Sequence, residues 1–124
     1  RKGRNDGWKL IKTAISVLGD KWVFRFKSRD DYEKSDFNKY MTYSEFITAM
    51  NDYGFFMEQA GKCKDAIFVL TYVLKLSPDR TPAYLNLADA LYKDGKEAKK
   101  YYKTYVDLMN KEGKDIPSRV YERL

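Results

Sequence analysis

Side chains that perform acid–base, metal or covalent chemistry are scarce in this chain of 124 residues. It contains no histidine and a single cysteine, Cys63, so it cannot assemble a tetrahedral zinc site from nitrogen and sulfur ligands. Lys62 and Lys64 flank Cys63 and would favour its thiolate, but no histidine is present to act as a base for it. The sequence therefore predicts a protein that is not an enzyme and uses no cofactor.

The carboxylates Asp30, Asp31 and Glu33 are the densest group of potential ligands for a hard cation. They lack the ordered spacing and the turn glycine of a calcium-binding loop. The surrounding stretch, residues 28–40, is polar and mixed in charge, which is typical of a solvated connector. We therefore expect no metal site.

The net charge of +6 comes mainly from the N-terminal third of the chain, where aromatic residues lie among the basic ones. Such a mixture could neutralise phosphates and stack on bases, so single-stranded nucleic acid is the alternative partner. No established nucleic-acid-binding motif accompanies it. The basic residues are Arg1, Lys2, Arg4, Lys9, Lys12, Lys21, Arg25, Lys27 and Arg29, and the aromatic residues are Trp8, Trp22, Phe24 and Phe26.

The elements that would position a binding surface are clearest between residues 47 and 80, where the spacing predicts two helices joined by a turn at Gly61. Thr42 and Glu45 form a capping-box pattern ahead of the first helix, and Pro78 ends the second. Gly54 and Ala66 would let the two helices approach closely. The apolar positions recur at steps of three and four residues: Met50, Tyr53, Gly54 and Met57, then Ala66, Leu70 and Val73.

The same pattern returns 34 residues later, which indicates an internal repeat. Thr81 and Pro82 predict the start of its first helix, Gly95 corresponds to Gly61, and Gly113 predicts the end of its second helix. Ala98 follows its turn glycine by three residues where Ala66 follows by five, so the second unit is two residues shorter. The equivalents of the first set are Tyr84, Leu87, Ala88 and Leu91.

This pattern resembles the tetratricopeptide repeat family over residues 47 to about 112. The resemblance implies two helix–turn–helix units stacked as a short right-handed array, whose inner helices line a concave groove that binds peptides or other proteins. The helix faces not used for packing then supply the expected partner contacts, with Phe55 foremost. These residues are Asn51, Phe55, Glu58 and Gln59 in the first unit and Asn86, Asp89 and Lys93 in the second.

The N-terminal region predicts a helix from Trp8 to Leu18 that ends at Gly19. Beyond it, aromatic and other residues alternate, which indicates an extended segment with an aromatic face. A single strand has no backbone partner, so either it pairs with something outside the chain or the segment is helical. We expect a secondary partner contact here, made by Trp22, Phe24, Arg25 and Phe26.

These elements predict a single, mostly α-helical domain with four parts: residues 1–41, a first repeat at 42–80, a second repeat at 81–113 and a capping helix at 114–124. Val120, Tyr121 and Leu124 would cover the exposed end of the last repeat. Two repeats are fewer than a stable array normally needs, so residues 8–40 should supply the missing neighbour.

No apolar run is long enough to span a bilayer, and no signal-peptide pattern precedes the first helix, so we expect a cytoplasmic protein with no membrane partner. The expected partner is a protein or peptide. A bacterial chaperone or a toxin-neutralising immunity protein would suit this size and architecture.

Overall fold

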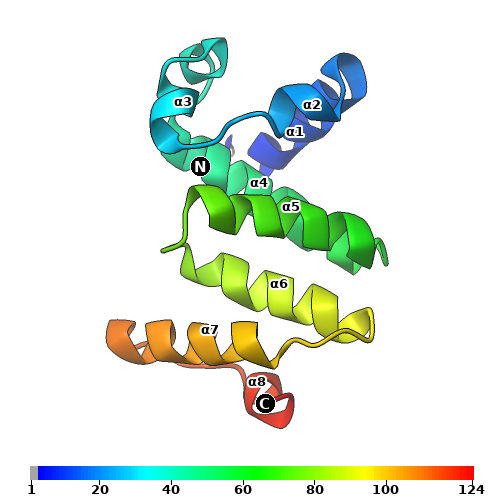
Figure 1. Cartoon of the computed structure of the whole chain (residues 1–124), viewed down its shortest axis with the longest axis vertical. Helices are drawn as coiled ribbons and strands as arrows, with labels where there is room; N and C mark the ends of the chain where they lie inside the picture. The colour runs from blue at the N-terminus through cyan, green and yellow to red at the C-terminus, as the bar shows by residue number, and fades with distance from the viewer. Residues whose placement is uncertain (1–2) are drawn as a thin grey trace.

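The computed structural model describes residues 3–124, and the side chains of residues 7–124 (Figure 1). All regular secondary structure in the described range is helical, which confirms the prediction of a mostly α-helical protein. The elements in chain order are α1 (Gly3–Leu18), α2 (Asp20–Val23), α3 (Arg29–Glu33), the 3₁₀ turn η1 (Asp36–Lys39), α4 (Tyr43–Gln59), α5 (Cys63–Leu76), α6 (Thr81–Lys93), α7 (Lys99–Glu112) and α8 (Ser118–Glu122).

Several helix ends form as their local sequence predicts. The Thr42 hydroxyl accepts the Glu45 N–H at 3.1 Å while the Glu45 carboxylate accepts the Thr42 N–H at 2.8 Å, which completes the capping box of α4. Gly19 and Gly113 follow α1 and α7 with φ angles of 88° and 66°, a region that glycine adopts without strain. These three boundaries are confirmed.

Of two further helix starts, the one predicted at Trp8 is wrong, whereas the one predicted at Thr81 and Pro82 is confirmed. α1 begins at Gly3, five residues before Trp8, so the charged stretch ahead of Trp8 extends the helix. Thr81 is the first residue of α6 and does not cap it, because its hydroxyl donates to Glu112 Oε2 of α7 at 2.6 Å. Arg80 occupies the cap position without a side-chain hydrogen bond.

α4 and α5 form an antiparallel pair whose approach depends on one missing side chain. A Cβ added at Gly54 would lie 2.6 Å from Leu70 Cγ, so any larger residue would push the helices apart. Ala66 is fully buried nearby, and the Tyr43 hydroxyl donates to the Leu76 carbonyl at 2.5 Å at the other end of the pair. The prediction of a close approach at Gly54 is confirmed.

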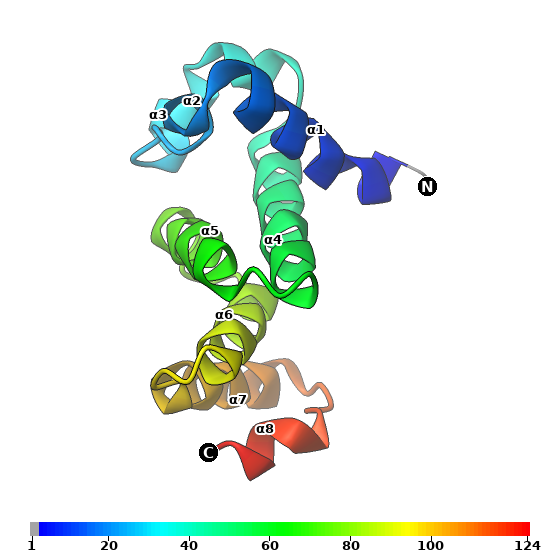
Figure 2. The same ribbon diagram turned by 90° about the vertical axis from the view of Figure 1, so that its right-hand side faces the viewer.

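α6 and α7 form a second antiparallel pair, and α8 follows at the opposite end of the molecule from α1 and α3 (Figures 1 and 2). Val120 of α8 is fully buried in a cluster with Tyr102 and Tyr105 of α7. Tyr121 and Leu124 remain 56% and 40% exposed, so the prediction that they cover the last helices is wrong for both. Of these three residues, Val120 is the one whose side chain is buried against α7, and α8 itself is only five residues long.

The N-terminal region packs against the first helix pair, as predicted for residues 8–40. α1 contacts α4, and Ile11 is buried in the same core as Met50. A Cβ added at Gly7 would lie 3.1 Å from the Ala49 Cβ, which marks where the two helices come closest. Residues from α2 and α3, including Val23 and Tyr32, complete this core.

The extended aromatic segment predicted at Trp22–Phe26 is not a strand. Trp22 lies in α2 and is 50% exposed, whereas Phe26 lies in the irregular link to α3 and is 1% exposed. The Tyr72 hydroxyl of α5 accepts the Phe26 N–H at 2.9 Å and donates to the Phe26 carbonyl at 3.1 Å. A side-chain hydroxyl therefore satisfies the backbone that a neighbouring strand would otherwise have to pair.

We expect Gly54→Ala to destabilise the protein by about 1–3 kcal/mol, because overpacking against Leu70 outweighs the gain in helix propensity. Leu70→Ala alone should cost about 2–5 kcal/mol by leaving a cavity. The double variant should lose on the order of 1 kcal/mol less than the sum, because the new methyl group occupies part of that cavity. Urea denaturation of all four proteins measures this, and strict additivity would contradict the contact.

Tyr72→Phe should lower the free energy of unfolding by about 1–3 kcal/mol, because it leaves both polar groups of the Phe26 backbone without their partner. Tyr40→Phe is the matched control, since the Tyr40 side chain is 84% exposed. Equal denaturation midpoints for the two variants would show that the Tyr72 hydroxyl does not hold the segment.

Candidate functional site

α4 and α6 lie parallel and in constant register. The Asn86 side-chain amide donates to Asn51 Oδ1 at 3.0 Å, and two helical turns further along Lys93 forms an ion pair with Glu58. Each pair joins residues that are 35 positions apart. Because both helices advance by the same seven residues between the two pairs, their axes run side by side in the same direction.

Most of the predicted contact residues lie close together in the structure, but they form hydrogen bonds and ion pairs between the helices. Asn51, Glu58 and Asp89 are 5%, 4% and 6% exposed, so the prediction that they line an open surface is wrong. Buried polar groups require partners, and the neighbouring helix supplies them. Gln59 donates to Glu58 Oε1 at 2.9 Å and, with Phe55 and Lys93, remains on the surface.

Asp89 connects three helices through its carboxylate. It accepts the Tyr102 hydroxyl of α7 at 2.6 Å, Arg119 Nη2 of α8 at 2.7 Å, and Nη1 of Arg123, the residue after α8, at 3.1 Å. Burial, followed by the hydrogen bond to Asp89, raises the pKa of Tyr102 to about 12. Neither arginine is among the predicted contact residues, although their spacing of four residues is typical of one face of a short helix.

Exposed aromatic side chains, here called the aromatic strip, lie on the two helices that these polar pairs join. Phe55 and Phe56 of α4 are 38% and 42% exposed, with ring centroids 5.4 Å apart, and Trp8 of α1 meets the Phe56 ring at 4.7 Å. On α6, Tyr92 is 49% exposed beneath the Arg123 guanidinium, which lies 4.1 Å from its ring centroid. We call this surface, from Trp8 and Phe55 to Tyr92, the inner face.

No family model, curated protein sequence or solved structure matches the chain. The function is therefore inferred from the residues that form the inner face and the remaining hollows of the molecule.

A second surface lies along α5, where the link between α2 and α3 passes it (Figure 1). Phe24, Arg25 and Phe26, three of the four predicted secondary contacts, line a groove of about 650 Å³ there, whereas Trp22 lies outside it. The Phe24 ring meets the rings of Phe68 and Tyr72 edge-on, at 4.9 and 5.1 Å. We call this hollow the α5 groove. Its other lining residues are Lys27, Lys64, Ile67, Phe68, Thr71, Tyr72 and Lys75.

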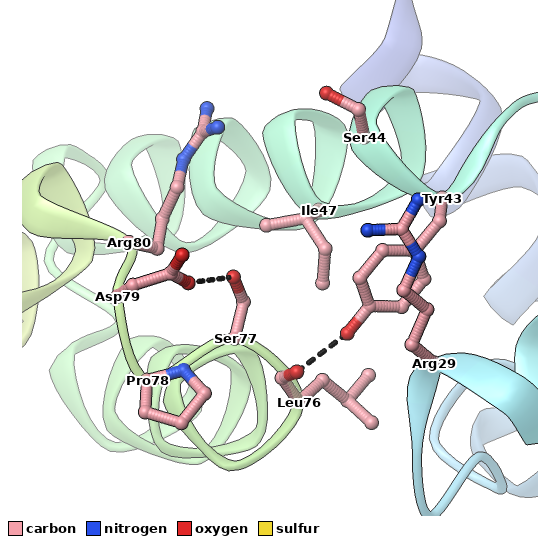
Figure 3. A pocket seen from close by; sticks show the side chains of 9 residues that line it. All are labelled: Arg29, Tyr43, Ser44, Ile47, Leu76, Ser77, Pro78, Asp79 and Arg80. Atoms are coloured by element: carbon pink, nitrogen blue, oxygen red, sulfur yellow. Dashed lines mark hydrogen bonds between the residues drawn. The ribbon is translucent and has the colours of Figure 1, made fainter.

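A third hollow, of about 370 Å³, lies between α3, the start of α4 and the loop after α5 (Figure 3). Two of its charged residues are paired: Ser77 donates to Asp79 at 2.9 Å, and Arg29 is paired with Glu33 at 3.1 Å. The Arg80 side chain extends towards α4, where its Nη2 donates to Thr48 at 2.8 Å. These bonds hold the loop in place, whereas the buried Nε of Arg80 has no hydrogen-bond partner among the described residues.

The acidic stretch on α3 is used within the chain. Asp30 pairs with Lys34 at 2.9 Å, and Asp31 accepts the Lys27 N–H at 2.9 Å. Among residues 3–124 no group of three or more histidine, cysteine, aspartate or glutamate side chains is placed to hold a metal ion. In the same part of the chain, no helix has both the length and the apolar character needed to cross a membrane.

The raised pKa of Tyr102 predicts a loss of stability at high pH. A group that keeps its proton more tightly in the folded state stabilises the fold below its unfolded pKa of about 10, and this contribution disappears as the pH rises through 12. The stability advantage of the wild type over Tyr102→Phe should therefore be full at pH 8 and shrink between pH 10 and 12. Urea denaturation at these pH values measures it.

Tyr121→Phe is the control for this titration, because Tyr121 is 56% exposed. A Tyr102→Phe variant whose stability difference from the wild type stayed constant up to pH 12 would contradict the assignment.

Proposed function

We propose that the protein is a non-enzymatic interaction module that binds a partner protein or peptide through its inner face. In this proposal residues 42–80 and 81–113 are two tetratricopeptide-like repeats, α8 caps the second, and α1 stands in for a repeat ahead of the first. The constant register of the Asn51–Asn86 and Glu58–Lys93 pairs supports the proposal, because equivalent helices of a repeat array lie parallel to each other.

The observation that carries the binding function is the exposed aromatic strip on the helices that these pairs join. Phe55 and Phe56 present large apolar surfaces with little conformational freedom, which is the character of residues that dominate binding energy at interfaces. Lys93 and Gln59 add polar groups at the edge of the same surface. The buried residues Asn51, Glu58 and Asp89 then act by fixing the helices that present the strip.

A chaperone or an immunity protein would use such a face to hold one partner. For single-stranded nucleic acid the aromatic set is poorly presented, because Phe26 is buried and Phe24 packs edge-on against Phe68. Trp22 is the one member of that predicted set whose side chain is half exposed. The protein partner is therefore the favoured reading of the surface.

Affinity capture from the native host, followed by measurement of Kd for the captured partner, tests the proposal. Phe55→Ala should weaken binding about 10- to 30-fold, which corresponds to about 1.4–2 kcal/mol. Tyr40→Ala, a change of another exposed aromatic residue on the connector, should leave Kd within about twofold. Circular dichroism melting should show both variants folded.

A partner that binds Phe55→Ala as tightly as the wild type would exclude the inner face. If Phe68→Ala abolished binding instead, the α5 groove would be the site of that partner.

A further inference from the structure

The α5 groove combines a positive rim with an apolar floor. Arg25, Lys27, Lys64 and Lys75 line it, and no acidic side chain does. All four are exposed, and within the part of the chain that the structure describes none of them forms an ion pair. Lys64 interacts at longer range with Asp94, so the free charge of this rim is concentrated at Arg25, Lys27 and Lys75.

Arg25 is held in place at the edge of the groove. Its guanidinium carbon lies 4.9 Å from the Trp22 ring centroid and 4.4 Å from that of Phe26, and its Nε donates to the Trp22 carbonyl at 3.0 Å. Among the described residues neither Nη group of Arg25 has a hydrogen-bond partner, so both can bind a carboxylate in bidentate fashion. An arginine fixed in this way loses less conformational entropy when it binds an anion.

The floor is apolar and remains open. Phe68 is 58% exposed, and Ile67 and Thr71 lie beside it on the same side of α5. The distance along the helix axis from Lys64 to Lys75 is about 16 Å, which an extended segment of about five residues spans.

The charge changes sign across the Phe24 and Phe68 pair. On the far side of these rings, Asp20 and Asp65 line a separate hollow of about 260 Å³. Binding of an acidic ligand is therefore favoured beside Lys27 and Lys75 and disfavoured beyond Phe68. This difference in charge determines the position of the ligand along the groove.

We propose that the α5 groove binds an extended acidic segment of a partner protein, with one bulky apolar side chain on Ile67 and Phe68 and flanking carboxylates at Arg25, Lys27 and Lys75. The carboxylates complement the unneutralised rim, and the apolar side chain covers the exposed ring. This surface shares no residue with the inner face, so it is a second interaction site with its own partner chemistry.

A peptide suits this groove better than a nucleic acid strand does. Successive bases need ring faces on which to stack, whereas the Phe24 ring stands at 68° to Phe68 and at 77° to Tyr72. Because these rings stand edge-on to one another, they do not form a continuous surface on which bases could stack. They leave room for one apolar side chain of a peptide.

The test uses the full chain and a fluorescent peptide that has one central phenylalanine between two runs of three glutamates. Anisotropy should show saturable binding that weakens as salt is raised, because the ion pairs are screened. A peptide with lysine in place of glutamate should not bind, and one with central alanine should bind at least tenfold more weakly. Lys75→Glu and Phe68→Ala should each weaken binding at least tenfold.

Lys99→Glu is the matched control, because Lys99 is an exposed lysine at the start of α7, outside the groove. The Kd of this variant for the peptide should lie within twofold of the wild-type value. Amide resonances of residues 24–27 and 64–75 should move on titration. Phe55→Ala should bind the peptide normally, which separates this site from the inner face.

Three results would overturn the proposal: no saturable binding of the acidic peptide, equal binding of the lysine peptide, or equal loss in Lys99→Glu and Lys75→Glu. A single-stranded oligothymidine that displaced the peptide and bound more tightly than it would also overturn it, in favour of nucleic acid.

Discussion

Two carboxylates buried between helices govern how the helices dock: Glu58 joins α4 to α6, and Asp89 joins α6 to α7 and to the α8 segment. A buried charge without a partner is strongly destabilising, so each carboxylate must find its cation as the helices pack. Lys93 meets Glu58 in one register of α4 against α6, and α8 must lie where its arginines reach Asp89. The need to pair these carboxylates also limits which polar residues are available to a partner protein, because the residues that form the pairs are held between the helices.

Features that depend on a few neighbouring residues were predictable from the sequence. The capping box of Thr42 and Glu45 and the glycines after α1 and α7 are local, because each is specified within one helical turn. The close approach at Gly54 was also predictable, since only a residue without a side chain fits where two apolar faces cross. The helical character of the fold follows from such signals together with the apolar spacing.

Features that depend on distant parts of the chain were not predictable in the same way. The alternation around Phe26 indicated a strand, but the hydroxyl that pairs with its backbone comes from Tyr72, 46 residues later. Likewise, the faces of α4 and α6 that carry Asn51 and Asp89 look solvent-facing in the sequence. The spacing of apolar residues does not show whether a polar helix face contacts water or a neighbouring helix. The α5 groove arises from the meeting of two such distant segments.

The five-residue length of α8 has a consequence for how the molecule opens. A helix of this length does not persist alone in water, so its structure exists only while Val120 and the two arginines are docked. Release of Asp89 and unwinding of α8 are therefore one event, a sub-global opening that leaves the α4–α5 core intact. Arg119 and Arg123 occupy the carboxylate of Asp89 next to Tyr92 while α8 is docked, so the α8 segment and a cationic ligand would compete for this end of the inner face.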